Sequence, residues 1–306
     1  MAAAPFAGSS FPNSSVPDRA TLVACVSFVA LGGVNFVAVR FSNRELAPMF
    51  GAGVRFLLAA ILLMIAFVLR RQVIPHGRSL TGVLLYGFLS FTVAYAFAYT
   101  ALTRLPAGIG SLVFASMPLF VVFLAHFHGL EPFRLRALVG ALITLAGIAI
   151  LANPFGEAVP LLPLLAMVGS AVAAAEGAVV SKMYPPVPPL VANAVAMLLG
   201  GGLLLGLSVA LGEPWALPSL SETWLAVSYL IVSSAIMFAL FIFVIQRWTA
   251  GSASYLTSLL PITAVLAAAP LLNEPLTAAL FIGGVVVLAG VYVGALRADR
   301  APALNP

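Results

Sequence analysis

The stretch from Arg104 to Gly147, RLPAGIGSLVFASMPLFVVFLAHFHGLEPFRLRALVGALITLAG, recurs from Arg247 to Gly290 as RWTAGSASYLTSLLPITAVLAAAPLLNEPLTAALFIGGVVVLAG. The two segments align without a gap at an offset of 143 residues and are identical at 13 of 44 positions. Many identities are Gly, Pro or charged residues, which shared hydrophobicity alone does not explain. They include Ala107-Gly108 with Ala250-Gly251, Pro118 with Pro261, and Glu131-Pro132 with Glu274-Pro275. The sequence therefore predicts a tandem repeat.

The composition places this repeat in a membrane. Of 306 residues, 62% are apolar and 8% are charged, and the mean hydropathy is +1.14, whereas soluble domains carry about 25% charged residues. Runs of about 20 apolar residues can cross the hydrocarbon core, where backbone amides without water partners must form helices. The sequence thus predicts an all-α polytopic membrane protein, with ten spans at residues 20–39, 47–69, 80–102, 108–128, 134–152, 161–182, 189–211, 223–246, 251–272 and 277–296.

The ten spans divide into two sets of five, which predicts repeats at residues 20–152 and 161–296. If the N-terminus is cytoplasmic, ten Lys and Arg residues fall in cytoplasmic segments and three on the other side, as the positive-inside rule requires. Both tails, residues 1–19 and 297–306, are then expected in the cytoplasm, and the first is expected to be disordered. Because five is an odd number, the second repeat is expected to be inverted relative to the first.

Two five-helix repeats, each with an Ala-Gly pair, a proline within a span, a Glu-Pro pair and a Gly-rich last span, resemble the EamA-type transporters of the drug/metabolite transporter (DMT) superfamily. Leu31-Gly32-Gly33, Pro48 and Arg55-Phe56 in the first repeat add to the resemblance. The second repeat has no Arg-Phe at the place of Arg55-Phe56, so we expect Arg55 to be a structural device of the first repeat. In its ten spans and its aromatic content, the chain is most similar to the YddG-type exporters of aromatic amino acids. The resemblance implies alternating access around a cavity walled by the third, fourth, eighth and ninth spans.

Tyrosine and serine residues recur at the same offset in the third and eighth spans. Tyr86 corresponds to Tyr229 and Ser90 to Ser233, and the two residues of each pair lie four apart, on one helix face. Hydroxyl groups in a membrane helix favour a wet interior over lipid. The alternative is interfacial anchoring by the tyrosines and close helix packing at the serines. The favoured interpretation is a solute-binding face made of Tyr86, Ser90, Tyr95, Tyr99, Tyr229, Ser233 and Phe238.

Glu176 is the one carboxylate deep within an expected span, and its counterpart in the first repeat, at an offset of 141, is Asn35. An unpaired charge at mid-bilayer is costly, so Glu176 is expected to be paired, protonated or in contact with water. We expect both residues to face the interior and contact the solute, with Glu176 binding an amine or exchanging a proton. The alternative is a structural hydrogen bond from Glu176 to Asn35 or Arg55.

Two further residue pairs recur between the repeats. Pro118 and Pro261 are expected to kink equivalent spans and act as hinges, because proline removes a helical hydrogen bond; the alternative is a static kink. Glu131 and Glu274 are expected to stabilise helix N-termini.

Several functions lack the residues that they need. The sequence has no Walker motif and no hydrolytic signature, which argues against an enzyme, and no cofactor motif. His126 and His128 do not share a helix face, so no metal site is expected, and the basic residues lie in short loops rather than in a nucleic-acid-binding patch. The sequence therefore predicts a monomeric exporter of aromatic or hydrophobic amino acids in the bacterial inner membrane, with the solute and lipid as its partners. The alternatives are a proton-coupled exporter of drugs, cations or other small metabolites that uses Glu176, and a membrane scaffold without transport.

Overall fold

The computed structural model describes residues 18–130, 135–152, 159–247 and 250–296, and all regular secondary structure within these ranges is helical. The elements are α1 (Arg19–Ser42), α2 (Pro48–Leu69), α3 (Arg78–Gly87), η1 (Phe88–Val93), α4 (Ala94–Ala101), α5 (Ala107–Phe114), α6 (Met117–Phe127), α7 (Leu135–Ala152), α8 (Leu161–Met183), α9 (Pro189–Ala210), α10 (Ser221–Arg247), α11 (Ala250–Leu272), α12 (Ala278–Val291) and η2 (Tyr292–Leu296). Here η denotes a π-helical segment.

These elements confirm the expected all-α fold with ten spans. Six helical segments are long and apolar enough to cross a membrane by length and composition, and four shorter apolar segments occupy the places of the other expected spans. The third span consists of α3, η1 and α4, and the fourth consists of α5 and α6. Each expected span therefore corresponds to a helix or to a short series of consecutive helices.

The starts of several helices follow from local sequence. The Asp18 side chain accepts a hydrogen bond from Thr21 N at 2.9 Å and caps α1, while Thr277 accepts one from Leu280 N at 3.1 Å and caps α12. The helices α2 and α9 each begin with a proline, Pro48 and Pro189, 141 residues apart. Proline is well tolerated there because the first amide of a helix has no intrahelical acceptor. The equivalent spans α2 and α9 thus both begin with a proline at the first helical position.

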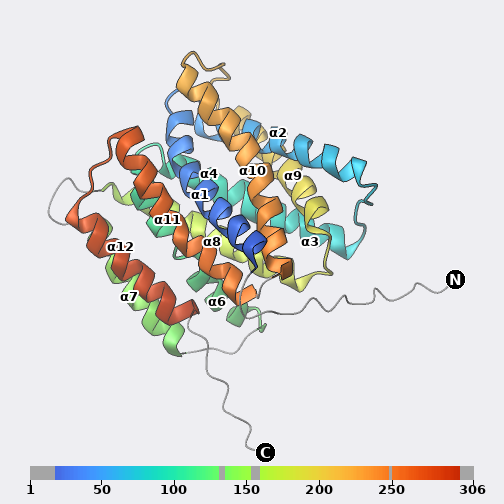
Figure 1. Cartoon of the computed structure of the whole chain (residues 1–306). Helices are drawn as coiled ribbons and strands as arrows, with labels where there is room; N and C mark the ends of the chain where they lie inside the picture. Colours follow the sequence, from blue (N-terminus) through green and yellow to red (C-terminus); the bar gives the residue numbers. More distant parts are fainter. Residues whose placement is uncertain (1–17, 131–134, 153–158, 248–249, 297–306) are drawn as a thin grey trace, which may run out of the picture.

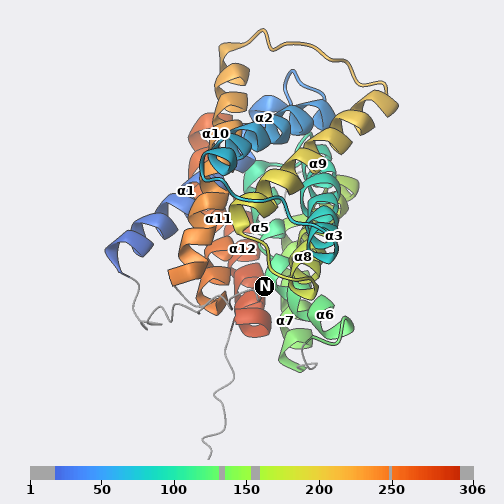
Figure 2. The same ribbon diagram turned by 90° about the vertical axis from the view of Figure 1, so that its right-hand side faces the viewer.

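The helices of each repeat pack mainly against those of the other. In Figure 1, α1 lies between α10 and α11, the third and fourth spans of the second repeat. In the corresponding way, α8 packs against α3, α4 and α6 of the first repeat. The second spans, α2 and α9, lie side by side, and so do the last spans, α7 and α12 (Figure 2). The core is therefore shared between the repeats.

The contact between α7 and α12 joins equivalent glycines. A Cβ added to Gly140 would lie 2.6 Å from the Gly290 carbonyl oxygen, and one added to Gly147 would lie 3.0 Å from the Gly283 oxygen. Because the contact order reverses along the chain, the two helices run antiparallel. Gly140 corresponds to Gly283 and Gly147 to Gly290 at the offset of 143, so both helices use the same surface. Small residues allow such close backbone approach in membranes.

The two equivalent prolines lie in different local structures. The fourth span is interrupted between Phe114 and Met117, just before Pro118, whose missing amide cannot bond back to the preceding turn. The Ser116 hydroxyl instead donates to the Val113 carbonyl at 2.6 Å, a local hydrogen bond that competes with the helix. Leu259 occupies the place of this serine in the second repeat, and α11 runs without interruption through Pro261.

Candidate functional site

A cavity of about 440 Å³ lies between the two repeats. Its walls are mainly apolar and aromatic and come from α1, the third and fourth spans, and α8 to α11. Its rim includes Ser79 near the start of α3, Tyr184 after α8, and Pro189 at the start of α9. The volume lies within the range of about 300–1,000 Å³ that is usual for small-molecule sites. The first, sixth and seventh spans thus contribute to the wall, in addition to the four expected.

A second cavity of about 100 Å³ adjoins the first and extends towards Asn35, Arg55 and Tyr99. Five residues line both cavities: Tyr95, Phe114, Ala174, Met237 and Leu260. The larger cavity therefore adjoins a smaller one that contains Asn35, Arg55 and Tyr99, and we call the smaller one the polar compartment after these residues.

The third span brings its predicted tyrosines and serine to these cavities. Tyr86, Ser90 and Tyr95 line the larger cavity, and Tyr99 lines the smaller one. The π-helical segment η1 lies between Tyr86 and Tyr95. A π-helical turn contains more residues than an α-helical turn because its hydrogen bonds run i→i+5, and both Ser90 and Tyr95 line the larger cavity although they are five residues apart. The Tyr86 hydroxyl donates to Asn193 Oδ1 of α9 at 3.3 Å, and Asn193 also lines the larger cavity.

Arg55 of α2 is the centre of the polar compartment and is only 2% exposed. Its Nε donates to Ser234 Oγ at 2.9 Å, its Nη2 to Asn35 Oδ1 at 3.2 Å, and its Nη1 to the Tyr99 hydroxyl at 3.4 Å. The guanidinium carbon also lies 5.2 Å from the centre of the Tyr95 ring. Every one of these partners is neutral. A buried cation without a counter-ion is costly, and dipoles and aromatic faces offset only part of that cost.

Two residues of α10, in the second repeat, hydrogen-bond to α1 beside this compartment. Ser233 donates to Asn35 Oδ1 at 2.9 Å, and the Tyr229 hydroxyl donates to the Leu31 carbonyl at 2.7 Å. Neither residue lines the two cavities, so in this conformation they hold α1 rather than form the wall. Phe238 belongs to α10, but its side chain lies outside the described part of the structure.

Glu176 lies away from Asn35 and from both cavities. Ala174 and Ala178, its neighbours two positions away on α8, line the larger cavity, whereas Glu176 does not. Its Oε1 lies 2.7 Å from His128 Nε2, at the end of α6. The structure therefore brings Glu176 together with a histidine, and not with Asn35 or Arg55, the two structural partners that the sequence suggested.

Sequence reasoning missed three residues of the site. Arg55 was expected to be a structural device, and Asn193 and Met237 were not singled out. Met237 Sδ accepts from Asn35 Nδ2 at 3.0 Å and lines both cavities. The available signal was the presence of Arg55 and Asn193 within apolar runs, because polar residues inside a membrane normally face the protein interior.

The opposite end of the molecule, where the loops after α1, α4, α9 and α11 meet, is tied together by side chains that bind backbone. Glu274 accepts from Ala107 N and Gly108 N at 2.6 and 3.1 Å, at the start of α5. It thus caps a helix of the first repeat, whereas its position before Pro275 suggested a role at the start of its own span. Asn43 Nδ2 donates to the Tyr99 carbonyl at 2.9 Å. These contacts hold the loops together at the end of the molecule next to Tyr99, which lines the smaller cavity.

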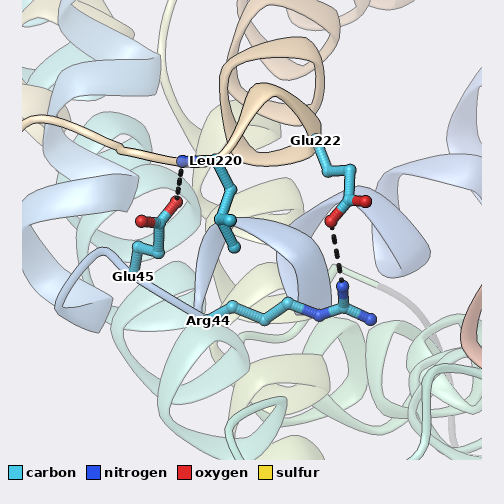
Figure 3. Close-up of polar contacts among 4 residues, drawn as sticks. All are labelled: Arg44, Glu45, Leu220 and Glu222. Carbon is cyan, nitrogen blue, oxygen red and sulfur yellow. Dashed lines mark hydrogen bonds and ion pairs between the residues drawn. The ribbon is translucent and has the colours of Figure 1, made fainter.

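The same end carries a second set of contacts between the repeats (Figure 3). Glu45 accepts a hydrogen bond from Leu220 N at 3.0 Å, just before α10. It also accepts one from Ser219 N at 2.9 Å. Arg44 forms an exposed ion pair with Glu222 at 3.5 Å. The hydrogen bond from the Ser219 side chain, with these backbone bonds, lowers the pKa of Glu45 to about 2. Glu45 therefore stays ionised at neutral pH and holds the two loops together.

A cavity between two similar five-span repeats is typical of multi-pass membrane transporters. The chain belongs to the EamA-like transporter family, which it matches over residues 19–153 and 161–295. It is a transporter rather than an enzyme, and the resemblance inferred from the sequence is confirmed at the level of the family.

Named relatives support the same class. The uncharacterized inner membrane transporter YedA of Escherichia coli (strain K12) is 32% identical over 272 residues, 85% of this chain and 86% of YedA. A probable amino-acid metabolite efflux pump of Salmonella typhimurium is 27% identical over 278 residues, 87% of this chain and 91% of the pump. A solved crystal structure with a TM-score of 0.66 and 24% identity, covering 92% of this chain and 99% of that chain, shares the fold.

Proposed function

We propose that this protein exports amino acids with aromatic or other hydrophobic side chains, by alternating access between inverted repeats. The antiparallel packing of α7 against α12 and the exchange of contacts between repeats support inversion. One chain encloses the whole cavity, which favours a monomer as the working unit. The name of the Salmonella relative, an amino-acid metabolite efflux pump, is consistent with this substrate class.

One observation carries the proposal: a large cavity with mainly apolar and aromatic walls adjoins the polar compartment, which holds Asn35, Arg55 and Tyr99. A hydrophobic amino acid has the same division, with an apolar side chain joined to a compact polar head. Tyr95 stands at the junction, where it lines both cavities. Stacking on its ring and hydrogen bonding to Asn35 or Tyr99 would orient such a solute with its head in the smaller compartment.

The conformation fits one stage of an export cycle. The rim residues Ser79, Tyr184 and Pro189 belong to segments that the positive-inside rule assigns to the cytoplasm. At the other end, Glu274 and Glu45 join the two repeats, and Asn43 ties the loop after α1 to α4 within the first repeat. In the proposed orientation, with both termini cytoplasmic, the cavity is open to the inside and ready to load solute.

Counterflow of the twenty amino acids into proteoliposomes containing the full chain tests the proposal. We expect saturable exchange of aromatic and large aliphatic amino acids, strongly reduced by Tyr95→Ala. Tyr292→Ala is the matched control, because Tyr292 is 52% exposed and lines neither cavity. Absence of saturable flux for every amino acid would refute the proposal and favour a scaffold without transport.

A proton-coupled exporter of cations is the second candidate, and the close contact between Glu176 and His128 is the observation that favours it. Two titratable groups 2.7 Å apart on different helices could exchange a proton as the helices move. Glu176→Gln decides between the candidates. Unchanged amino-acid counterflow, together with no transport of cationic dyes by the unmodified protein, would exclude the second candidate.

A further inference from the structure

Arg55 is a buried cation that has no anion among the residues that contact it. The described hydrogen bonds of its guanidinium go to Ser234, Asn35 and Tyr99, which are all neutral. The two salt bridges among the described residues, Arg44 with Glu222 and His128 with Glu176, do not involve it. The site thus supplies dipoles around the arginine but no balancing charge.

The guanidinium also borders space that a small anion can occupy. Arg55 and Asn35 both line the compartment of about 100 Å³. A water molecule takes about 30 Å³ of the liquid, so the compartment has room for a group of a few heavy atoms. A carboxylate suits this room, and a planar guanidinium is the side chain that pairs with carboxylates most specifically.

We propose that Arg55 is the residue that selects solutes by their carboxylate. This inference rests on the proposed function and names the part of the solute that enters the polar compartment. The carboxylate accepts hydrogen bonds from the guanidinium, while the apolar side chain points past Tyr95 into the larger cavity. Binding supplies the missing negative charge, so a solute with an amine but no carboxylate would place two cations together. Arg55 therefore favours amino acids and disfavours purely cationic drugs.

A series of competitors with one common ring isolates the carboxylate. In counterflow of radiolabelled phenylalanine by the unmodified protein, 3-phenylpropionate keeps the carboxylate and lacks the amine. Phenylalanine amide and phenethylamine keep the amine and lack the carboxylate. We expect the two amines to compete at least about tenfold more weakly than phenylalanine, which matches the loss of a hydrogen bond to a charged group. Equal competition by the amines would overturn the proposal while leaving amino-acid transport intact.

Variants of the arginine give a second, independent comparison. Arg55→Met removes the charge, and Arg55→Lys keeps the charge but loses the planar fork. We expect both to weaken phenylalanine counterflow, Arg55→Met more strongly, and the preference for carboxylates over amines to disappear in Arg55→Met. Arg44→Gln is the matched control, because Arg44 pairs with Glu222 on the exposed end. A carboxylate preference that survives in a folded Arg55→Met protein would overturn the proposal.

Thermal stabilisation separates failure of this inference from failure of the proposed function. If no amino acid is transported but 3-phenylpropionate raises the melting temperature of the unmodified protein, and does not do so in Arg55→Met, the arginine binds carboxylates in a protein with another role. If neither transport nor stabilisation by any carboxylate is found, both proposals are wrong.

Discussion

Replacement of Glu274 by glutamine should weaken the closed end of the transporter. Glu274 lies between α11 and α12 of the second repeat, and its two oxygens bind Ala107 N and Gly108 N in the first repeat. The contact therefore bridges parts that must separate if the repeats rock apart at this end. Its carboxylate also faces the positive end of the α5 dipole. Glutamine has nearly the same shape but no charge and a single acceptor oxygen.

The expected size of the effect follows from these two hydrogen bonds. A hydrogen bond to a charged group contributes about 1.5–3 kcal/mol, and the substitution removes one bond and the charge from the other. A loss of about 1.5–3 kcal/mol from the closed state alone changes the ratio of closed to open molecules by about 10- to 100-fold. The open state should then be populated much more often, with no other change in the cavity.

Labelling of a cysteine in the polar compartment measures this shift. In a Cys25→Ala background, Val39→Cys places a thiol at a position that is 3% exposed and lines the smaller cavity. An impermeant maleimide applied at the proposed outer face should label Val39→Cys about tenfold or more faster when Glu274→Gln is added. Glu222→Gln is the control, because it removes an exposed ion pair from the same end, and such pairs contribute little. Equal labelling rates for the two glutamine variants would refute the reasoning.

Three further predictions concern packing, solute binding and pH. Gly147→Leu should lower the melting temperature strongly, because its Cβ would lie 2.6 Å from Val287 N and overpacking costs about 1–3 kcal/mol or more. Gly202→Leu is the control and should leave the melting temperature nearly unchanged, because a Cβ at Gly202 meets nothing within 4 Å. Tyr86→Phe keeps the ring and loses the hydroxyl bond to Asn193, so we expect KM to rise about two- to tenfold with little change in maximal flux. Because the pKa of Glu45 is lowered from 4.5 to about 2, its stabilising contribution is present above pH 4.5 and is lost as the pH falls towards 2. The difference in melting temperature between the unmodified protein and Glu45→Gln should therefore be equal at pH 7 and pH 5.5, and a decline between these values would contradict it.

The fold could be predicted because its signals are periodic and strong. Ten apolar runs and a repeat at a fixed offset determine the spans, and the α2 and α9 starts at Pro48 and Pro189 agree with them to one residue. The apolar runs and the repeat did not predict that the helix is interrupted before Pro118 but continuous through Pro261. That difference depends on whether a neighbouring side chain competes for backbone hydrogen bonds, as Ser116 does.

The candidate site was predicted in part. Tyr86, Ser90, Tyr95 and Tyr99 meet the cavities because they follow one side of a single span, with a π-helical segment that accommodates the five-residue step. Glu176 could not be placed in this way. At an offset of 141, Glu176 corresponds to Asn35. The two residues nevertheless have different neighbours, because Glu176 contacts His128 whereas Asn35 contacts Arg55 and Ser233. Only the packing of α8 against α6 brings Glu176 to His128.

Arg55 occurs in the first repeat only, although the helices around it belong to two similar repeats. At the offset of 141 that relates Pro48 to Pro189, the counterpart of Arg55 is Ala196, which is fully buried and uncharged. A second arginine there would place two cations on facing helices, since α2 packs against α9, and like charges in a low dielectric repel strongly. The glycine contacts of α7 and α12, by contrast, occur in both repeats. Symmetric packing therefore suits the parts that would move, whereas the proposed anion site needs one charge from one repeat, near the boundary between the two.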